Sequence, residues 1–265
     1  MWRLLRFPCS KWRAIEAPMK SKATCGYRMK RFVAANVVIT LLSTSVAAIQ
    51  RSADSAKADL TKVLNLMRVH DDWQNRHLVE YQVRRRFYAE NPRFKQESTL
   101  EVKTRFRRPG IFESEVVRSE GSQMIRERVF DKILDAEKEA SSKEIKREVS
   151  ITPANYDFVP IGRQDCGGRA CYNIRITPKQ KNKYSLNGQI WVDAEDGAIV
   201  RMQGSPAVRP SFWTLSTEIE RRYERIDGVW LCVDTESTSN IFVAGRSTLK
   251  INYDYIEVHT EDNLE

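Results

Sequence analysis

The sequence lacks the residue patterns on which common catalytic sites are built. It contains no G-x-S-x-G, H-E-x-x-H, P-loop or Rossmann glycine pattern, which argues against the hydrolases, zinc proteases and nucleotide enzymes that depend on them. It has only three histidines: His70 and His77 lie in the first predicted helix and His259 lies near the C-terminus, so none neighbours a plausible nucleophile. We therefore expect a protein that is not an enzyme and that holds no cofactor or metal.

The part of the chain after residue 31 also lacks net charge. The whole sequence carries +9, but the first 31 residues hold nine of the 44 basic residues and one of the 35 acidic residues. The remainder has 35 basic and 34 acidic residues, a charge of +1. So small an excess gives no bulk electrostatic reason to bind a polyanion, and we expect no nucleic-acid partner.

Residues 29–48, MKRFVAANVVITLLSTSVAA, have the pattern of an export signal. Basic residues come first, an apolar run follows, and small residues at the end suit signal peptidase. We expect cleavage near Ala48 and a periplasmic or otherwise exported protein; the alternative is an uncleaved anchor in the inner membrane. Residues 1–28 are a basic extension, which is not translated if Met29 is the true start. Residues 49–265 form one domain, because no repeat or linker divides them.

Three cysteines follow the signal, and none stands where a lipid anchor would be attached. Cys166 and Cys171 flank the loop sequence GGRA between two strand-like segments. Paired positions at the end of an antiparallel hairpin lie within the range of a disulfide, and an oxidising compartment favours the bond. We predict a disulfide between them; the alternatives are two reduced cysteines in a turn and, least favoured, a metal site. Cys232 is predicted to be a small buried residue.

Hydrophobic periodicity divides the domain into one helix and a series of strands. Residues Asp54 to His77 have helical spacing with one apolar face, which predicts an amphipathic helix that covers a sheet. From Leu78 onward the period changes to two, as in Val79–Val83 and Leu100–Phe106. The later candidate strands are Phe112–Arg118, Met124–Phe130, Tyr156–Arg163, Cys171–Thr177, Ser185–Asp193, Ala198–Gly204, Phe212–Arg225, Val229–Ser239 and Ser247–Val258.

Short turn signals between the strands favour antiparallel hairpins over parallel crossovers. Glu120-Gly121, Gly167-Gly168, Asp196-Gly197 and Asp227-Gly228 are of this kind. One helix interrupts the strands at Asp131–Arg147, where most residues are charged. Such a helix is held loosely, which is typical of a lid and also of a solvated connecting helix.

Charged clusters have simple structural interpretations. The basic runs Arg84–Arg86 and Arg221–Arg222 fall in alternating strands, so successive side chains point to opposite faces and make no continuous patch. We interpret them as residues that keep the outer sheet face wet. The acidic residues Asp193, Glu195 and Asp196 fall in a tight hairpin turn, where Asp is favoured for its own turn-forming hydrogen bonds rather than for catalysis or calcium binding.

Aromatic residues gather in the predicted strands, where they either fill a core or line a cavity. Three further stretches resemble the LolA-like superfamily of periplasmic lipoprotein carriers. They are Phe106–Phe112 (FRRPGIF), Ile176–Lys179 (ITPK) and Gln189–Met202 (QIWVDAEDGAIVRM), which appear in the family's order. The resemblance covers about residues 54–204. The stretch Gly204–Trp213 has no counterpart in it, and is either a bend between long strands or a contact at a cavity rim.

The resemblance implies an α+β fold with a single curved antiparallel sheet, an unclosed half β-barrel covered by the N-terminal helix and a short lid helix. Its concave apolar face would bind acyl chains, and by motif position Arg108 would clasp the lid shut. Candidate lining residues are Tyr81, Phe106, Phe112, Trp191, Phe212, Trp213 and Trp230. The expected function is a periplasmic carrier of a lipid or lipidated polypeptide, related to outer-membrane lipoprotein sorting. The alternative is an interaction or sensor module that binds a membrane-protein segment, favoured if the cavity is polar or plugged.

Overall fold

The computed structural model describes residues 57–263. The predicted basic extension at residues 1–28 and the signal peptide at residues 29–48 lie outside the described residues. The description below concerns the domain that contains residues 57–263.

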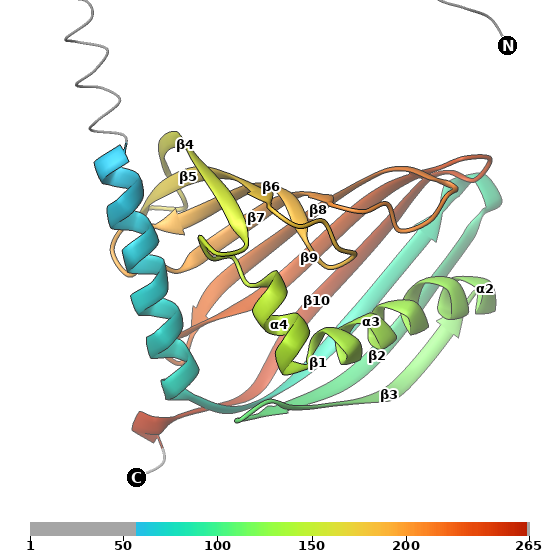
Figure 1. Cartoon of the computed structure of the whole chain (residues 1–265). Helices are drawn as coiled ribbons and strands as arrows, with labels where there is room; N and C mark the ends of the chain where they lie inside the picture. The colour runs from blue at the N-terminus through green and yellow to red at the C-terminus, as the bar shows by residue number, and fades with distance from the viewer. Residues whose placement is uncertain (1–56, 264–265) are drawn as a thin grey trace, which may run out of the picture. The chain divides into compact units, whose positions relative to one another are not determined.

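One ten-stranded antiparallel sheet forms the frame of the domain (Figure 1). Its spatial order is β3-β2-β1-β10-β9-β8-β7-β6-β5-β4, so β3 and β4 are its two edges and the sheet is not closed. Most neighbours are consecutive in the chain, because short turns join antiparallel strands. The strands are β1 (Leu78–Asn91), β2 (Gln96–Arg107), β3 (Ile111–Gly121), β4 (Tyr156–Asp165), β5 (Ala170–Pro178), β6 (Leu186–Asp193), β7 (Ile199–Pro206), β8 (Thr214–Ile226), β9 (Val229–Ile241) and β10 (Gly245–Thr260).

Two helical covers lie on the concave side of the sheet (Figure 1). The first is the helix at residues 57–77. The second lies between β3 and β4 and comprises α2 (Gln123–Ile125), the π-helical turn η2 (Arg126–Phe130), α3 (Asp131–Ala140) and α4 (Lys143–Val149). Single 3-10 turns, η1 (Pro92–Phe94) and η3 (Glu261–Asn263), follow β1 and β10. The predicted α+β fold with an open antiparallel sheet is confirmed.

The predicted strand at Met124–Phe130 is wrong, because this segment is helical in α2 and η2. The side chain of Ser122 accepts a hydrogen bond from the backbone N–H of Ile125, which caps the start of α2. Ile125 and Phe130 are then buried against Phe87 and neighbouring sheet residues. The pair is five residues apart, which a π-helical turn places on one face. Tertiary burial therefore decides the structure of a segment whose apolar residues alone resemble a strand.

Three clusters of buried side chains join the helical covers to the sheet. The first lies under the helix at 57–77, the second under α2 and η2, and the third near the C-terminal end of that first helix. Their buried members are, respectively, Val63, Met67, Tyr156, Tyr172, Ile174, Ile176, Ile190 and Val192; Phe87, Ala89, Leu100, Val102, Ile125, Phe130 and Ile251; and Val229, Leu231 and Val258.

Candidate functional site

A cavity of about 720 Å³ lies between the sheet, the end of the first helix and the α3–α4 segment. Strands β1, β2, β8, β9 and β10 form its floor, and the turn between β2 and β3 forms part of its rim. Its lining comprises Gln74, Asn75, Leu78, Tyr81, Val83, Arg85, Thr104, Phe106, Pro109, Gly110, Ile111, Phe112, Glu137, Ala140, Ser141, Lys143, Lys146, Arg221, Tyr223, Trp230, Leu231, Cys232, Tyr253 and Tyr255.

Aromatic rings dominate the floor of this cavity and many of them carry hydroxyl groups. The ring of Tyr81 stacks on Phe106 at 5.1 Å between centroids and meets Tyr255 edge-on at 5.5 Å. Burial raises the pKa of Tyr81 to about 12, and burial likewise raises the pKa of Tyr253 to about 12. Both phenols are therefore neutral at ordinary pH, so they add polarity to the floor without adding charge.

The charge of the lining is strongly positive. Four basic residues line the cavity (Arg85, Arg221, Lys143 and Lys146), and Glu137 is the one acidic residue among them. Glu137 is already paired with Arg85. Three positive charges therefore face the cavity without a carboxylate partner in its lining. The expectation of a purely apolar cavity is replaced by an aromatic floor that carries fixed positive charge.

Arg85 of β1 connects the sheet to α3. Its guanidinium donates to both carboxylate oxygens of Glu137, at 2.9 and 2.8 Å, and also to the hydroxyls of Thr104 and Ser114, at 3.0 and 3.3 Å. The Arg85 side chain is 3% exposed and the Glu137 side chain 29%. The guanidinium carbon lies 5.2 Å from the ring centre of Phe87. Both bonds to Glu137 come from Nη1, and this charge-assisted contact joins the sheet to α3.

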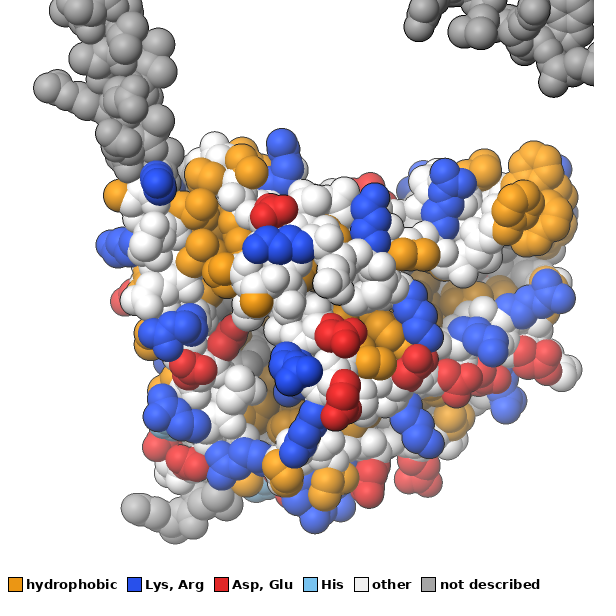
Figure 2. Space-filling view, in the orientation of Figure 1, with side chains coloured by type: hydrophobic (Ala, Val, Ile, Leu, Met, Phe, Trp, Pro, Cys, Tyr) orange, Lys and Arg blue, Asp and Glu red, His pale blue; other side chains and the backbone are white. Residues whose placement is uncertain are grey.

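Apart from the Arg85–Glu137 pair, few contacts hold segment α3–α4, which we call the lid, against the sheet. Neither α3 nor α4 contains a buried residue. A second ion pair joins Glu139 of α3 to Lys183 at 2.7 Å, but both side chains are more than half exposed. Figure 2 shows alternating acidic and basic side chains over this region. Ile133 and Leu134 of α3 are half-buried against the cluster that contains Phe87 and Phe130, so this partial apolar contact and the Arg85–Glu137 pair together hold the lid on the sheet.

Four of the seven candidate lining residues from the sequence lie on the cavity: Tyr81, Phe106, Phe112 and Trp230. The other three lie elsewhere. Trp191 follows Ile190 and precedes Val192, which both face the first helix, so alternation turns Trp191 to the opposite face, where Arg201 stacks on it at 4.6 Å. Phe212 and Trp213 are exposed in the loop before β8. Strand alternation and loop placement thus separate the two groups.

Arg108, the clasp residue implied by the resemblance, lies in the turn directly after β2 and does not line the cavity. Its guanidinium donates to the backbone oxygen of Arg76, at the end of the first helix, and to Glu261 at 2.9 Å. It therefore ties that helix and the C-terminal turn to the sheet. The contact with the lid is made instead by Arg85, which sequence reasoning assigned to the outer face. The available signal was the alternation of Val83, Arg85 and Phe87 on one face.

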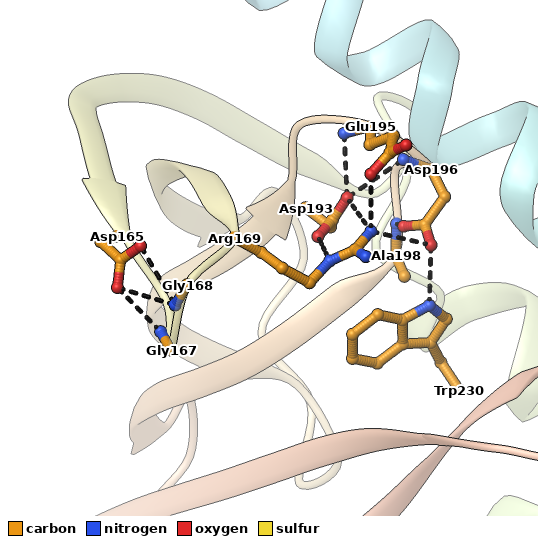
Figure 3. A network of polar contacts seen from close by, with 9 residues as sticks. All are labelled: Asp165, Gly167, Gly168, Arg169, Asp193, Glu195, Asp196, Ala198 and Trp230. Carbon is orange, nitrogen blue, oxygen red and sulfur yellow. Dashed lines mark hydrogen bonds and ion pairs between the residues drawn. The ribbon is translucent and has the colours of Figure 1, made fainter.

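A polar network supports the wall of the cavity beside Trp230 (Figure 3). The indole N–H of Trp230 donates to Asp196 at 3.1 Å, and Arg169 donates to Asp193 at 3.0 Å and to Asp196 at 3.5 Å. Burial alone would raise the pKa of Asp193, but Arg169 and the backbone N–H groups of Glu195 and Asp196 outweigh it and lower the pKa to about 2. The acidic turn thus has the structural role predicted for it.

All three described cysteines are free in the structure. Register pairs Cys171 with Gln164 and Ala170 with Asp165, so Cys166 lies within the turn rather than directly opposite Cys171. The predicted disulfide is therefore not confirmed. Burial, followed by a hydrogen bond with Cys166, raises the pKa of the Cys171 thiol. Cys232, predicted to be buried, is half-buried and lines the cavity.

Residues 57–263 contain neither a cluster of metal-ligating side chains nor a membrane-spanning helix. No group of three His, Cys, Asp or Glu side chains is arranged to hold a metal ion there. Nor does this part of the chain contain a helix whose length and hydropathy suit a membrane span.

Residues 114–205 match the model of the MucB/RseB N-terminal domain. This segment runs from within β3 through the lid to β7, so it contains most of the edge strand β3, the whole edge strand β4 and the lid. No curated protein matches the chain. The MucB/RseB match and the open sheet confirm the predicted resemblance to the LolA-like superfamily.

Several solved structures are similar to the chain. One is a putative outer membrane lipoprotein-sorting protein domain from Vibrio parahaemolyticus, with 11% identity, 76% of this chain and 93% of that chain covered, and a TM-score of 0.38. Another is a LolA superfamily protein from Nitrosomonas europaea, with 8% identity, 77% and 92% covered, and a TM-score of 0.31. A third is the Pseudomonas aeruginosa MucA/MucB complex, with 10% identity, 76% and 94% covered, and a TM-score of 0.21. These similarities concern the fold alone.

Proposed function

We propose that the protein is an exported, non-enzymatic binding protein that holds one acyl-bearing ligand with a negatively charged group, either a lipid or a lipidated polypeptide. The observation that carries the proposal is the composition of the cavity, which combines an aromatic floor with positive charges that its lining does not balance. Its volume of about 720 Å³ is in the range of pockets that enclose a whole small ligand.

The acyl part of such a ligand would be bound by apolar burial, and its charged part by electrostatic attraction. The acyl part gains from burial against Phe106, Phe112 and the tyrosine rings, at about 25 cal/mol for each Å² removed from water. The charged part gains from Arg221, which lines the cavity beside Tyr223 and Tyr253. One acyl chain alone gives reversible binding, so a second, electrostatic contribution raises affinity without making release impossible. That balance suits a carrier.

The lid would control entry through the Arg85–Glu137 pair. When the lid opens, the buried guanidinium of Arg85 loses its partner, and an unpaired buried charge is costly. An anionic ligand group can replace Glu137 at that position. Ligand entry would then release the lid and ligand loss would close it, which is the role that the resemblance implied for Arg108. That role for Arg85 is part of the proposal.

Native mass spectrometry of protein purified from its own periplasm tests the proposal. We expect a co-purified anionic, acyl-bearing molecule in the wild type and its loss from Arg221→Gln. The matched control is Arg222→Gln, because Arg222 is the next residue, points to the other face and pairs with Asp234 at 2.8 Å. A protein that carries no such molecule, or an Arg221→Gln variant that retains it, would contradict the proposal.

A second candidate is a module that binds a segment of a membrane protein. It is favoured by the MucB/RseB match, by the sheet edges inside the matched region, and by the charged residues of the cavity, because a polar cavity is the condition that favours a module over a carrier. Both edges expose apolar side chains, Val116 and Val117 on β3 and Val159 and Ile161 on β4, and an extended segment can pair with an open edge. Hydrogen exchange on a captured complex separates the two functions. Protection of β4 or β3 supports the module, whereas protection of the lid and cavity supports the carrier.

A further inference from the structure

We propose that a cluster of exposed aromatic residues at the end of the sheet remote from the cavity docks the protein on an anionic lipid bilayer. The cluster, which we call the aromatic tip, consists of Phe212 and Trp213 before β8 and Phe242 and Val243 between β9 and β10. Their side chains are 87, 56, 57 and 60% exposed. Figure 2 shows hydrophobic side chains gathered at this corner of the molecule, at the upper right.

The tip is an ordered structure formed by two loops. The backbone N–H of Phe242 donates to the backbone oxygen of Trp213 at 2.8 Å, and Thr214 pairs with Ile241 directly below. The ring of Trp213 stacks on Phe242 at 6.1 Å and meets Phe212 edge-on at 5.5 Å. The rings are thus held together while remaining in water. Holding them in place beforehand lowers the ordering cost of binding a surface.

The backbone conformation of Val243 is a second observation that supports a binding role for the aromatic tip. Its φ is +70°, in the left-handed region that a β-branched residue rarely adopts. Its side chain is largely exposed, so core packing does not compensate for this strain. Strain of this kind concentrates at binding and switching sites. A glycine would adopt the same turn without strain but would remove an apolar side chain from the tip.

The charges around the tip identify the partner. Three segments meet at this end of the sheet: the side chain of Asn91 donates to the backbone oxygen of Ala244 at 3.0 Å, and the backbone N–H of Phe242 donates to the backbone oxygen of Trp213. These segments, residues 91–96, 205–217 and 237–249, carry Arg93, Lys95, Arg209 and Arg246 and contain no acidic residue. All four basic side chains are exposed, and none forms an ion pair within residues 57–263. The three segments are therefore positive themselves, and the nearest acidic residues, Glu90, Glu97, Glu218 and Glu236, flank them further along the strands.

Exposed aromatic rings beside lysine and arginine are the combination that binds an anionic membrane surface. Tryptophan favours the interface between headgroups and acyl chains, and basic residues attract anionic headgroups. Apolar and electrostatic contributions together give a binding that neither gives alone. The cavity residues Leu78, Tyr81 and Trp230 lie at the other ends of β1 and β9, so the tip is separate from the ligand site. Docking through it leaves the cavity free.

Vesicle binding by the full chain tests the proposal. The probes are vesicles of phosphatidylcholine alone and vesicles that also contain phosphatidylglycerol, both with bromine-labelled acyl chains that quench nearby tryptophan. We expect quenching with the anionic vesicles only, and its loss in Trp213→Phe, since the difference between these proteins isolates Trp213 from the other tryptophans. Arg209→Gln with Arg246→Gln should weaken binding about fivefold for each charge removed.

Two control variants match these changes on other surfaces. Val117→Ser removes an exposed apolar side chain from the edge strand β3, and Lys103→Gln removes an exposed charge from β2. Both should bind vesicles like the wild type. Wild-type protein without quenching on anionic vesicles, or equal quenching in Trp213→Phe, overturns the proposal. So does a dimer in solution that Phe212→Ser converts to a monomer, because a second copy would then cover the tip.

Discussion

The concave face of the sheet has two covers that are built differently. The helix at residues 57–77 buries Val63 and Met67 to 1 and 4% exposure against β5 and β6. The lid buries no side chain of α3 or α4, and its nearest buried residues, Ile125 and Phe130, lie before it in α2 and η2. The first cover is attached by apolar burial along its length, whereas the second is attached at one end and by the Arg85–Glu137 pair.

Because of this difference, we expect the helix at residues 57–77 to contribute to the stability of the fold and the lid to open more easily. Apolar burial is lost only when the helix leaves the sheet, so the first cover belongs to the cooperative core. The hairpin turn beside it reinforces the point: Gly197 has φ +79°, and a Cβ there would lie 2.5 Å from the backbone carbon of Leu66. A single polar pair, in contrast, can exchange its partner for a ligand or for water. We therefore expect the lid to open at a lower free energy than is needed to move the helix at residues 57–77 off the sheet.

The largest expected effect is on the fixed wall. Met67→Ala removes a buried side chain and leaves a cavity under the first helix, so it should lower the free energy of unfolding by about 2–5 kcal/mol. Leu134→Ala, at a half-buried position of α3, should lower it by less than about 1 kcal/mol. Chemical denaturation measures both, with the exposed Val69→Ala on the same helix as control. Equal losses at positions 67 and 134 would remove the distinction between wall and lid.

The next largest effect is expected in the polar network around Asp193, Arg169 and Trp230 (Figure 3), which lies beside the cavity. The folded pKa of Asp193, about 2, is lower than its ordinary value of 3.8. The charged carboxylate therefore stabilises the fold above about pH 4, and this contribution is lost as the pH falls from about 4 to 2. Asp193→Asn should cost on the order of 2 kcal/mol at pH 7 and much less near pH 2.

Denaturation of Asp193→Asn and wild type across this pH range measures the difference. Glu195→Gln is the matched control, because Glu195 lies in the same turn and meets the same Arg169 at 3.3 Å but is 83% exposed. Its effect should stay below about 1 kcal/mol at every pH. A constant gap between wild type and Asp193→Asn from pH 7 to pH 2 would show that ionisation of Asp193 does not stabilise the wall.

The wall was easier to predict from the sequence than the lid site. Helical spacing up to His77 and alternation after Leu78 report burial on one face, which is a local property of the sequence. The role of Arg85 depends on a partner 52 residues away, and alternation alone gives its face but no partner. The cysteine pair shows the same limit: the hairpin pattern brings Cys166 and Cys171 within hydrogen-bonding distance, but it does not decide whether they form a covalent bond. Local sequence patterns therefore predict the helices and strands. Which side chains of different elements meet can be read only from the three-dimensional structure.

The lid pair itself gives the third prediction. Glu137→Gln keeps the shape of the side chain but removes the charge that holds Arg85, so lid opening should become easier by on the order of 1.5 kcal/mol. Hydrogen exchange in α3 should then rise about tenfold while exchange in the helix at 57–77 stays unchanged. The control is Glu139→Gln, because the pair of Glu139 with Lys183 is largely exposed. Unchanged α3 exchange in Glu137→Gln would mean that another contact holds the lid.

The smallest effect is expected at Arg108, and it decides between the two candidate clasps. The side chains of Arg108 and Glu261 are 39 and 48% exposed, and exposed ion pairs contribute about 0–1 kcal/mol. Arg108→Leu should therefore change the free energy of unfolding by less than about 1 kcal/mol and leave α3 exchange unaltered. Fraying should increase only at the end of the first helix, where Arg108 contacts the backbone oxygen of Arg76. The contrary result is that Arg108→Leu accelerates hydrogen exchange in α3 as Glu137→Gln does. That result would mean that the lid is coupled to the end of the helix at residues 57–77, and that the two covers move together rather than separately.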